Sequence, residues 1–314
     1  MRKSASKLLA IMGPTASGKT ALAVRLAQAC NGAVINCDSM QMYADLPVLT
    51  AQPSMDERQG VPHHLFGVLP GDDKCQAARY TELARPVLAA IRDAGQQPIL
   101  CGGTGLYFRS LTEGLAPIPP IPVALHNMAV LMHKDIGGAA LRARLAEVDA
   151  VTAARLNDGD TQRLIRAWEV YVATGTPLST WQRESHDTRA LETEWHAYIL
   201  LPPRAELYTK INRRFDVMMQ SGVVDEVRTL LAKGYPDDLP VMRAHGVPEI
   251  TAYLRGEWSE TAAVTRAQQV TRNYAKRQYT WFAHQLHEKY PNNVTLVHDF
   301  GASAAAWAAV KDAA

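Results

Sequence analysis

The residues with the clearest chemical capacity are 13–20, which read Gly-Pro-Thr-Ala-Ser-Gly-Lys-Thr. They match the pattern GxxxxGK[ST] and lie between an apolar stretch and a helical pattern, the context that such a phosphate-binding loop requires. Glycines let the backbone wrap an anion, N–H groups at the helix start point inward, and Lys19 adds a positive charge. We therefore predict phosphate or diphosphate binding by Gly13, Pro14, Thr15, Ala16, Ser17, Gly18, Lys19 and Thr20. The Thr20 hydroxyl is placed to ligate Mg²⁺.

Two further groups follow predicted strands. Asp38 ends an apolar run at 33–37, and Gly102-Gly103-Thr104-Gly105 follows another at 98–101. A dedicated ATPase or GTPase would also need an apolar strand that ends in a magnesium-holding aspartate. The strand at 98–101 ends in a glycine-rich turn in place of such an aspartate. The predicted crevice instead combines a set of cationic donors, one carboxylate and one hydroxyl. This set suits transfer from a pyrophosphate ester with the carboxylate as base, and it also fits a small-molecule kinase.

The elements that must position these groups alternate between strand and helix. Strands are predicted at 7–12, 33–37, 98–101 and 195–201, with helices at 19–29 and 77–94. This order indicates βαβ units and a parallel sheet. Later helices are expected at about 204–220, 223–233 and 259–288.

A proline-rich connector at 117–122 cannot continue a helix or lie in a central strand. The helical pattern after it, 123 to about 174, is interpreted as an insertion. We thus expect an α/β fold with a P-loop NTPase-like parallel-sheet core, residues 1–117 and 191–314, and a helical insertion domain, residues 118–190. The composition of the alanine-rich tail, 301–314, gives no prediction of its structure.

Composition excludes some classes of protein. The chain has 314 residues, 47% of them hydrophobic, and a formal net charge of +2, which is ordinary for a globular protein. No apolar run reaches the roughly 18 residues of a membrane span, and the first thirty residues do not read as a signal peptide. Cys30, Cys37, Cys75 and Cys101 are scattered and are interpreted as buried free thiols in a reducing cytoplasm.

Charge is unevenly distributed near the C-terminus. No acidic residue lies between Glu260 and Glu288, whereas Arg266, Arg272, Lys276 and Arg277 all do. Such a helix fits a polyanion-binding surface, and it equally fits a basic, solvated helix face.

From about Leu8 to Phe282 the chain resembles the bacterial tRNA dimethylallyltransferases, also called tRNA isopentenyltransferases. The resemblance is carried by GPTASGKT at 13–20, DSMQMY at 38–43, PHHL at 62–65, GGTGLYF at 102–108, QRLIRAWEVYVATG at 162–175, INRRFDVMMQSGVVDEV at 211–227 and TRNYAKRQYTWF at 271–282. The first string is generic to P-loop proteins, whereas the ordered combination is specific to this family.

The resemblance implies alkylation of N6 of the adenine 3′ of the anticodon, with dimethylallyl diphosphate as donor and Mg²⁺ as cofactor. It implies that Asp38 is the general base, and that Thr104 and Arg214 act on the diphosphate leaving group. The structural alternatives are a helix cap or magnesium ligand for Asp38 and a solvated charge beside Arg213 for Arg214.

The family's partner is the tRNA anticodon stem-loop, whose adenine must leave its stack. Similarity assigns RNA contacts to Asp38, Ser39, Met40, Gln41, Thr104, His126, Gln162, Arg163, Leu164, Ile165, Arg166, Arg243, Arg272, Lys276 and Arg277. Arg163 and Arg166 share a helix face. Ordinary charged residues on a helix surface would have the same spacing, so this alternative stays open. Tyr274 and Trp281 fit base stacking, but we interpret them as core residues. Adjacent His63 and His64 are interpreted as structural, not as metal ligands.

The sequence departs from the family in several contacts. Leu49-Thr50-Ala51-Gln52-Pro53 replaces GTAKP, His126 replaces a usual arginine, and His245-Gly246-Val247-Pro248 replaces IGYR or IGYK. Asn273 and Ala283 also stand where arginines are frequent. These changes predict retained chemistry with altered tRNA affinity or preference. The alternatives are a P-loop small-molecule kinase and a noncatalytic RNA-binding ATPase module. We expect a cytoplasmic monomer without membrane association.

Overall fold

The computed structural model describes residues 7–184, 191 and 193–313. The chain divides into a larger unit, drawn from residues 1–112 and 192–314, and a smaller one, drawn from residues 113–191. It leaves the larger unit after Thr112, where a helix ends, and hence before the proline-rich connector. Residues 185–190, in which the expected insertion ends, lie outside the described part.

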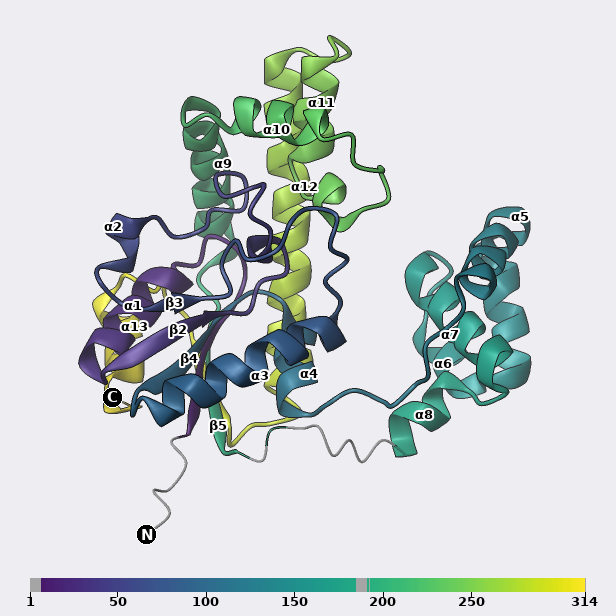
Figure 1. Cartoon of the computed structure of the whole chain (residues 1–314), viewed down its shortest axis with the longest axis horizontal. Coiled ribbons are helices and arrows are strands. Elements are labelled where there is room, and N and C mark those ends of the chain that lie inside the picture. The colour runs from purple at the N-terminus through teal and green to yellow at the C-terminus, as the bar shows by residue number, and fades with distance from the viewer. Residues whose placement is uncertain (1–6, 185–190, 192, 314) are drawn as a thin grey trace. The chain divides into compact units, whose positions relative to one another are not determined.

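A parallel sheet forms the centre of the larger unit (Figure 1). It has six strands, in the order β3-β2-β4-β1-β5-β6. Its strands are β1 (Leu8–Met12), β2 (Gly32–Asn36), β3 (His63–His64), β4 (Gln97–Gly102), β5 (Trp195–Leu200) and β6 (Val294–Val297). The predicted α/β class and four of its strands are confirmed. The two outermost strands were missed, because runs of two and four residues are too short to show a period.

The sheet is buried from both sides. Every residue of β1 and β2 is buried, as expected for parallel strands covered by helices on both faces. Leu9 and Ile11 of β1 pack with Leu22 and Leu26 of the first helix. The third helix packs against β2 and β4. This rigid sheet positions the turns that follow its strands.

Nine α-helices surround the sheet or extend from it in the described part of the larger unit. They are α1 (Lys19–Ala29), α2 (Met55–Arg58), α3 (Ala77–Asp93), α4 (Gly105–Thr112), α9 (Arg204–Gln220), α10 (Val223–Ala232), α11 (Val247–Leu254), α12 (Glu260–Thr280) and α13 (Ala304–Val310). Short 3₁₀ turns lie at Met40–Met42, Pro240–Arg243 and Lys311–Ala313.

Two C-terminal predictions need correction. The helix expected at 259–288 is α-helical only to Thr280 and continues as a π-helix over Trp281–Leu286; a composition pattern cannot register this local change in hydrogen bonding. The tail at 301–314, for which no element was predicted, contains α13, and this helix lies beside α1 (Figure 1).

The smaller unit is helical, with α5 (Val123–Val148), α6 (Ala150–Arg155), α7 (Thr161–Thr174) and α8 (Leu178–Glu184). It has a hydrophobic core of its own, to which Leu141, Leu145 and Leu164 contribute. Gly137, at φ 78° and ψ 168°, interrupts the helical path within α5. Among the described residues of both units, no helix is long and apolar enough to cross a bilayer.

Candidate active site

Three neighbouring strands deliver the predicted chemical groups to one edge of the sheet. β4 lies between β1 and β2, with Met12 beside Gly102 and Asn36 beside Cys101. The phosphate loop, Asp38 and Thr104 each follow the carboxyl end of one of these strands, where ligands bind in open α/β sheets. A Cβ on Gly102 would lie 2.1 Å from the carbonyl carbon of Cys37. Glycine is therefore required for this close approach.

The phosphate loop has the conformation that its glycines predict. Gly13 and Gly18 have φ values of +144° and +87°, and α1 begins at Lys19. The Lys19 Nζ donates to the Pro14 carbonyl at 2.6 Å. Burial lowers the pKa of Lys19 to about 8, although nearby Cys101 and Asp38 oppose this shift. The lysine is thus a poorly solvated cation, which gains when an anion arrives.

The C-terminal segment supports this loop. Gly301 N donates to the Ser17 carbonyl at 3.0 Å, and Ser17 is fully buried. A Cβ on Gly301 would lie 2.2 Å from the Gly18 carbonyl oxygen. Nothing in the sequence near Gly301 indicated this contact, because it joins residues almost a full chain apart.

Asp38 and Thr104 belong to one hydrogen-bonded arrangement. The Thr104 hydroxyl accepts from Ser39 N at 3.0 Å, and Asp38 Oδ1 accepts from Met40 N at 3.1 Å. The Tyr274 hydroxyl lies near both side chains. Burial, and secondarily the Asp38 charge, raise the pKa of Tyr274, whereas its hydrogen bond with Thr104 opposes the rise. A carboxylate and two hydroxyls therefore meet beside the phosphate loop.

Arg214 reaches the same crevice from α9. Its Nη2 donates to the Thr15 hydroxyl at 2.5 Å. Burial lowers the pKa of Arg214, and Asp38 opposes this effect. Arg213, by contrast, is exposed. The geometry therefore favours the site interpretation of Arg214 over that of a solvated helix charge.

The segment 38–43 is held on two sides. The Gln41 amide nitrogen donates to the carbonyls of Thr50 and Ala51, both at 2.9 Å, so a side chain expected to contact RNA holds the 49–53 loop here. Gln52, which stands at the usual lysine position, donates to the Tyr43 carbonyl at 2.7 Å.

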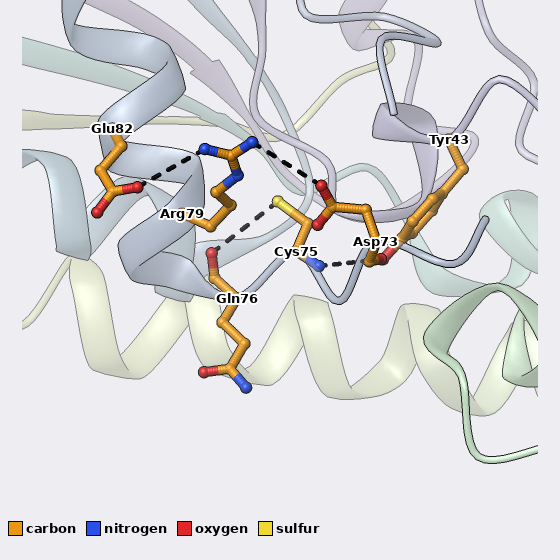
Figure 2. Close-up of polar contacts among 6 residues, drawn as sticks. All are labelled: Tyr43, Asp73, Cys75, Gln76, Arg79 and Glu82. Carbon is orange, nitrogen blue, oxygen red and sulfur yellow. Dashed lines mark hydrogen bonds and ion pairs between the residues drawn. The ribbon is translucent and has the colours of Figure 1, made fainter. Parts of the chain in front are cut away.

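Tyr43 connects this segment to the start of α3. Its hydroxyl donates to the Asp73 carbonyl at 2.9 Å and accepts from Cys75 N at 3.4 Å (Figure 2). Arg79 lies between two carboxylates: its Nη2 is 3.9 Å from Asp73 Oδ2, and its Nη1 is 3.8 Å from Glu82 Oε2. The segment that carries Asp38 is thus anchored at both ends.

The four cysteines are free, with Cys37 and Cys101 buried but Cys30 and Cys75 only half-buried, which corrects the expectation that all four are buried.

Among the predicted RNA contacts of the larger unit, most of the cationic side chains lie on its surface. Arg243, Lys276 and Arg277 are exposed, whereas Arg272 is half-buried and donates to Asn212 Oδ1 at 2.5 Å. The Tyr274 ring lies 4.9 Å from the His245 ring. Trp281 packs on Gly105, where a Cβ would lie 2.3 Å from the indole. Both aromatic rings are therefore packed within this unit.

The smaller unit separates its predicted RNA contacts into two groups. His126, Gln162, Arg163 and Arg166 are exposed, but Leu164 and Ile165 are only 0% and 8% exposed and pack in the core. The latter two side chains are therefore removed from the predicted contact surface, because their place on the helix turns them inward.

Sequence reasoning missed Glu169, which organises this surface. Its side chain is buried, yet Oε2 lies 2.6 Å from His126 Nδ1 and Oε1 accepts from Arg166 Nη1 at 2.6 Å. The signal available was the position of Glu169 one turn after Arg166.

Fold and site together define a P-loop α/β protein whose crevice joins an anion-binding loop to a carboxylate and a hydroxyl. The sequence profile described as IPP transferase matches residues 41–285, and that of isopentenyl transferase matches residues 6–65. The chain therefore belongs to the IPP transferase family.

Individual relatives agree with this assignment. The chain is 49% identical over 279 residues to a tRNA dimethylallyltransferase of Rhodospirillum centenum, covering 89% of each, and 49% identical to that of Phenylobacterium zucineum over 88% of this chain and 89% of the relative. The crystal structure of the Bacillus halodurans tRNA isopentenylpyrophosphate transferase is similar at a TM-score of 0.66 and 33% identity, over 93% of this chain and 89% of that one. A eukaryotic dimethylallyltransferase acting on tRNA shares the fold, with a TM-score of 0.79 at 24% identity over 96% of this chain and 75% of that one.

Proposed function

We propose that this enzyme transfers a dimethylallyl group from dimethylallyl diphosphate to N6 of the adenosine 3′ of the anticodon, position 37 of tRNA, releasing diphosphate. The observation that carries the proposal is the placement of Asp38 and Thr104 on adjacent strand ends beside the phosphate loop. Membership of the IPP transferase family and similarity to named tRNA dimethylallyltransferases support the same reaction.

The crevice offers a group for each part of the transfer. N6 forms a bond to C1 of the dimethylallyl group while the C1–O bond breaks and its electron pair leaves with diphosphate. The Asp38 carboxylate accepts the N6 proton. Loop N–H groups, Lys19 and Arg214 stabilise charge that develops on the diphosphate. The Thr104 hydroxyl, beside Asp38, donates to the bridging oxygen.

The residues fit a magnesium ion held mainly by substrate. No cluster of three or more His, Cys, Asp or Glu side chains that could hold a metal occurs in the described part of the chain. Mg²⁺ commonly takes one or two protein ligands together with phosphate oxygens. Thr20, the first-turn hydroxyl of α1, would be such a ligand. When bound, the ion would neutralise charge on the diphosphate.

The RNA partner in this proposal is the tRNA anticodon stem-loop, contacted by the exposed cations of both units. Single-stranded RNA is bound by phosphate contacts and by holding unstacked bases. We further propose that the enzyme works as a cytoplasmic monomer, which gel filtration with light scattering and fractionation of cells would test.

The direct test incubates the protein with Mg²⁺, radiolabelled dimethylallyl diphosphate and unmodified tRNA with adenosine 3′ of the anticodon. Label should enter the tRNA, and Asp38→Ala should lower kcat by about 10²- to 10⁴-fold while leaving tRNA affinity nearly unchanged. Binding of tRNA without transfer of label would support the RNA-binding module instead. Consumption of ATP with a small acceptor would support the kinase.

A further inference from the structure

Gln278 of α12 connects two turns of the crevice that are remote in sequence. Its Oε1 accepts from Thr15 N at 2.9 Å, and its Nε2 donates to the Gly103 carbonyl at 2.9 Å. The side chain is 5% exposed, although α12 is otherwise rich in polar, solvent-facing residues. One buried amide thus links the phosphate loop to the turn that carries Thr104.

The two partners require both halves of an amide. Thr15 N is a donor and the Gly103 carbonyl is an acceptor, so the bridging group must accept at one end and donate at the other. Glutamate lacks the donor when ionised, and leucine lacks both. Leaving either backbone group buried without a partner is costly. Chemistry alone therefore determines the orientation of the Gln278 amide.

The surroundings leave no room for adjustment. A Cβ on Gly103 would lie 2.2 Å from Gln278 Nε2 and 3.3 Å from Asp38 Oδ2. Thr15 also accepts from Arg214 through its hydroxyl. A continuous path hence runs from Arg214 through Thr15 and Gln278 to Gly103, the residue that precedes Thr104.

We propose that Gln278 is a positioning residue, which sets the separation between the diphosphate-binding loop and the Asp38–Thr104 pair. The inference rests on the proposed function for its kinetic consequence. Gln278 does not touch the reacting atoms; its amide holds the two turns that do. Misplacement of reacting groups by about 1 Å can lower a rate about 10²-fold.

The test compares Gln278→Leu with Gln268→Leu, a matched control on the same helix. Gln268 donates to Asp216 Oδ1 at 2.8 Å and bridges α12 to α9 away from the loop. We expect Gln278→Leu to lower kcat by about 10²-fold with tRNA affinity unchanged, and Gln268→Leu to keep kcat within about twofold of wild type. Hydrogen exchange of the Thr15 amide should accelerate only in Gln278→Leu.

A second variant separates positioning from general loss of structure. In Gln278→Glu, an ionised carboxylate cannot donate to the Gly103 carbonyl, whereas a protonated one can. Burial raises the pKa of such a carboxyl, so the activity of this variant relative to wild type should recover as the pH falls from about 8 to about 6.

Equal kcat values for the two leucine variants, with unchanged exchange at Thr15, would overturn the inference. A flat relative pH profile for Gln278→Glu would do the same. If the wild-type protein transfers no label, the proposed function fails, and exchange at Thr15 alone then decides whether Gln278 holds the loop.

Discussion

The crevice of the larger unit and the surface of the smaller one that is proposed to contact RNA are built in opposite ways. In the crevice, Arg214, Thr15 and Gln278 form hydrogen bonds between residues up to 263 positions apart. On the smaller unit, His126 and Arg166 are 54% and 46% exposed and share one buried carboxylate, Glu169. The crevice holds its groups rigidly, whereas the surface displays charge in water.

The difference follows from the two tasks. Transfer chemistry depends on donors that are already aimed at the developing charge, and such donors act strongly where water is excluded. RNA affinity depends mainly on cations that neutralise phosphates, a contribution that survives in water and falls with salt. Substitutions in the crevice should therefore lower kcat, and substitutions on the smaller unit should change tRNA affinity.

After Asp38→Ala, the largest effect is expected at Thr104. Thr104→Ala removes a hydroxyl donor to the leaving group and the acceptor for Ser39 N, so kcat should fall by about 10²- to 10³-fold. Thr104→Ser retains the hydroxyl and should recover most of the rate. Single-turnover transfer of label to saturating tRNA measures both. An unchanged tRNA dissociation constant in Thr104→Ala would support this division between chemistry and affinity; a large loss of affinity would contradict it.

Binding of the diphosphate group of the prenyl substrate should depend on pH through Lys19. Because the pKa of Lys19 is lowered to about 8, its ammonium form becomes the minor species as the pH rises through that value. Between about pH 7 and pH 9 the charged fraction falls about tenfold, and the Kd for diphosphate should rise accordingly. Calorimetry at several pH values measures this change. The same titration with Lys19→Met reports ionisation of the ligand alone, and the rise in Kd should remain after the wild-type values are divided by those of this variant.

A smaller effect is expected at Glu169. Glu169→Gln removes the charge that holds His126 and Arg166, which should raise the KM for tRNA by about three- to tenfold while kcat stays near wild type. Glu147→Gln, an exposed carboxylate of α5, is the control and should change neither. Steady-state kinetics with varied tRNA distinguishes the two. A fall in kcat alone would place Glu169 in the chemistry and contradict the division of tasks.

The smallest effect is expected at His126. His126→Arg restores the cation usual at this position in the resembled family, so tRNA should bind about two- to fivefold more tightly near neutral pH. The slope of log K against log salt should steepen by about one. Filter binding at several salt concentrations measures both quantities. An unchanged slope would show that this position does not contact a phosphate.

Local sequence predicted much of this protein, because the relevant signals lie within a few residues. The strand, glycine-rich loop and helix from 8 to 29 have one consistent pattern, and α9 begins and ends where it was expected. Asp38 and Thr104 could be proposed as partners since both follow predicted parallel strands. The short outer strands and the π-helix at Trp281–Leu286 carry no comparable local signal.

The amino-acid sequence alone predicts the α/β class, the phosphate loop and the groups that can do the chemistry. How those groups are held is visible only in the folded chain, where Gly301 bonds to Ser17, Gln278 bridges Thr15 and Gly103, and Glu169 contacts His126. The physical reason is that a hydrogen bond depends on distance in space. Partners far apart along the chain leave no periodic trace in it, whereas a loop or a strand is formed by neighbours.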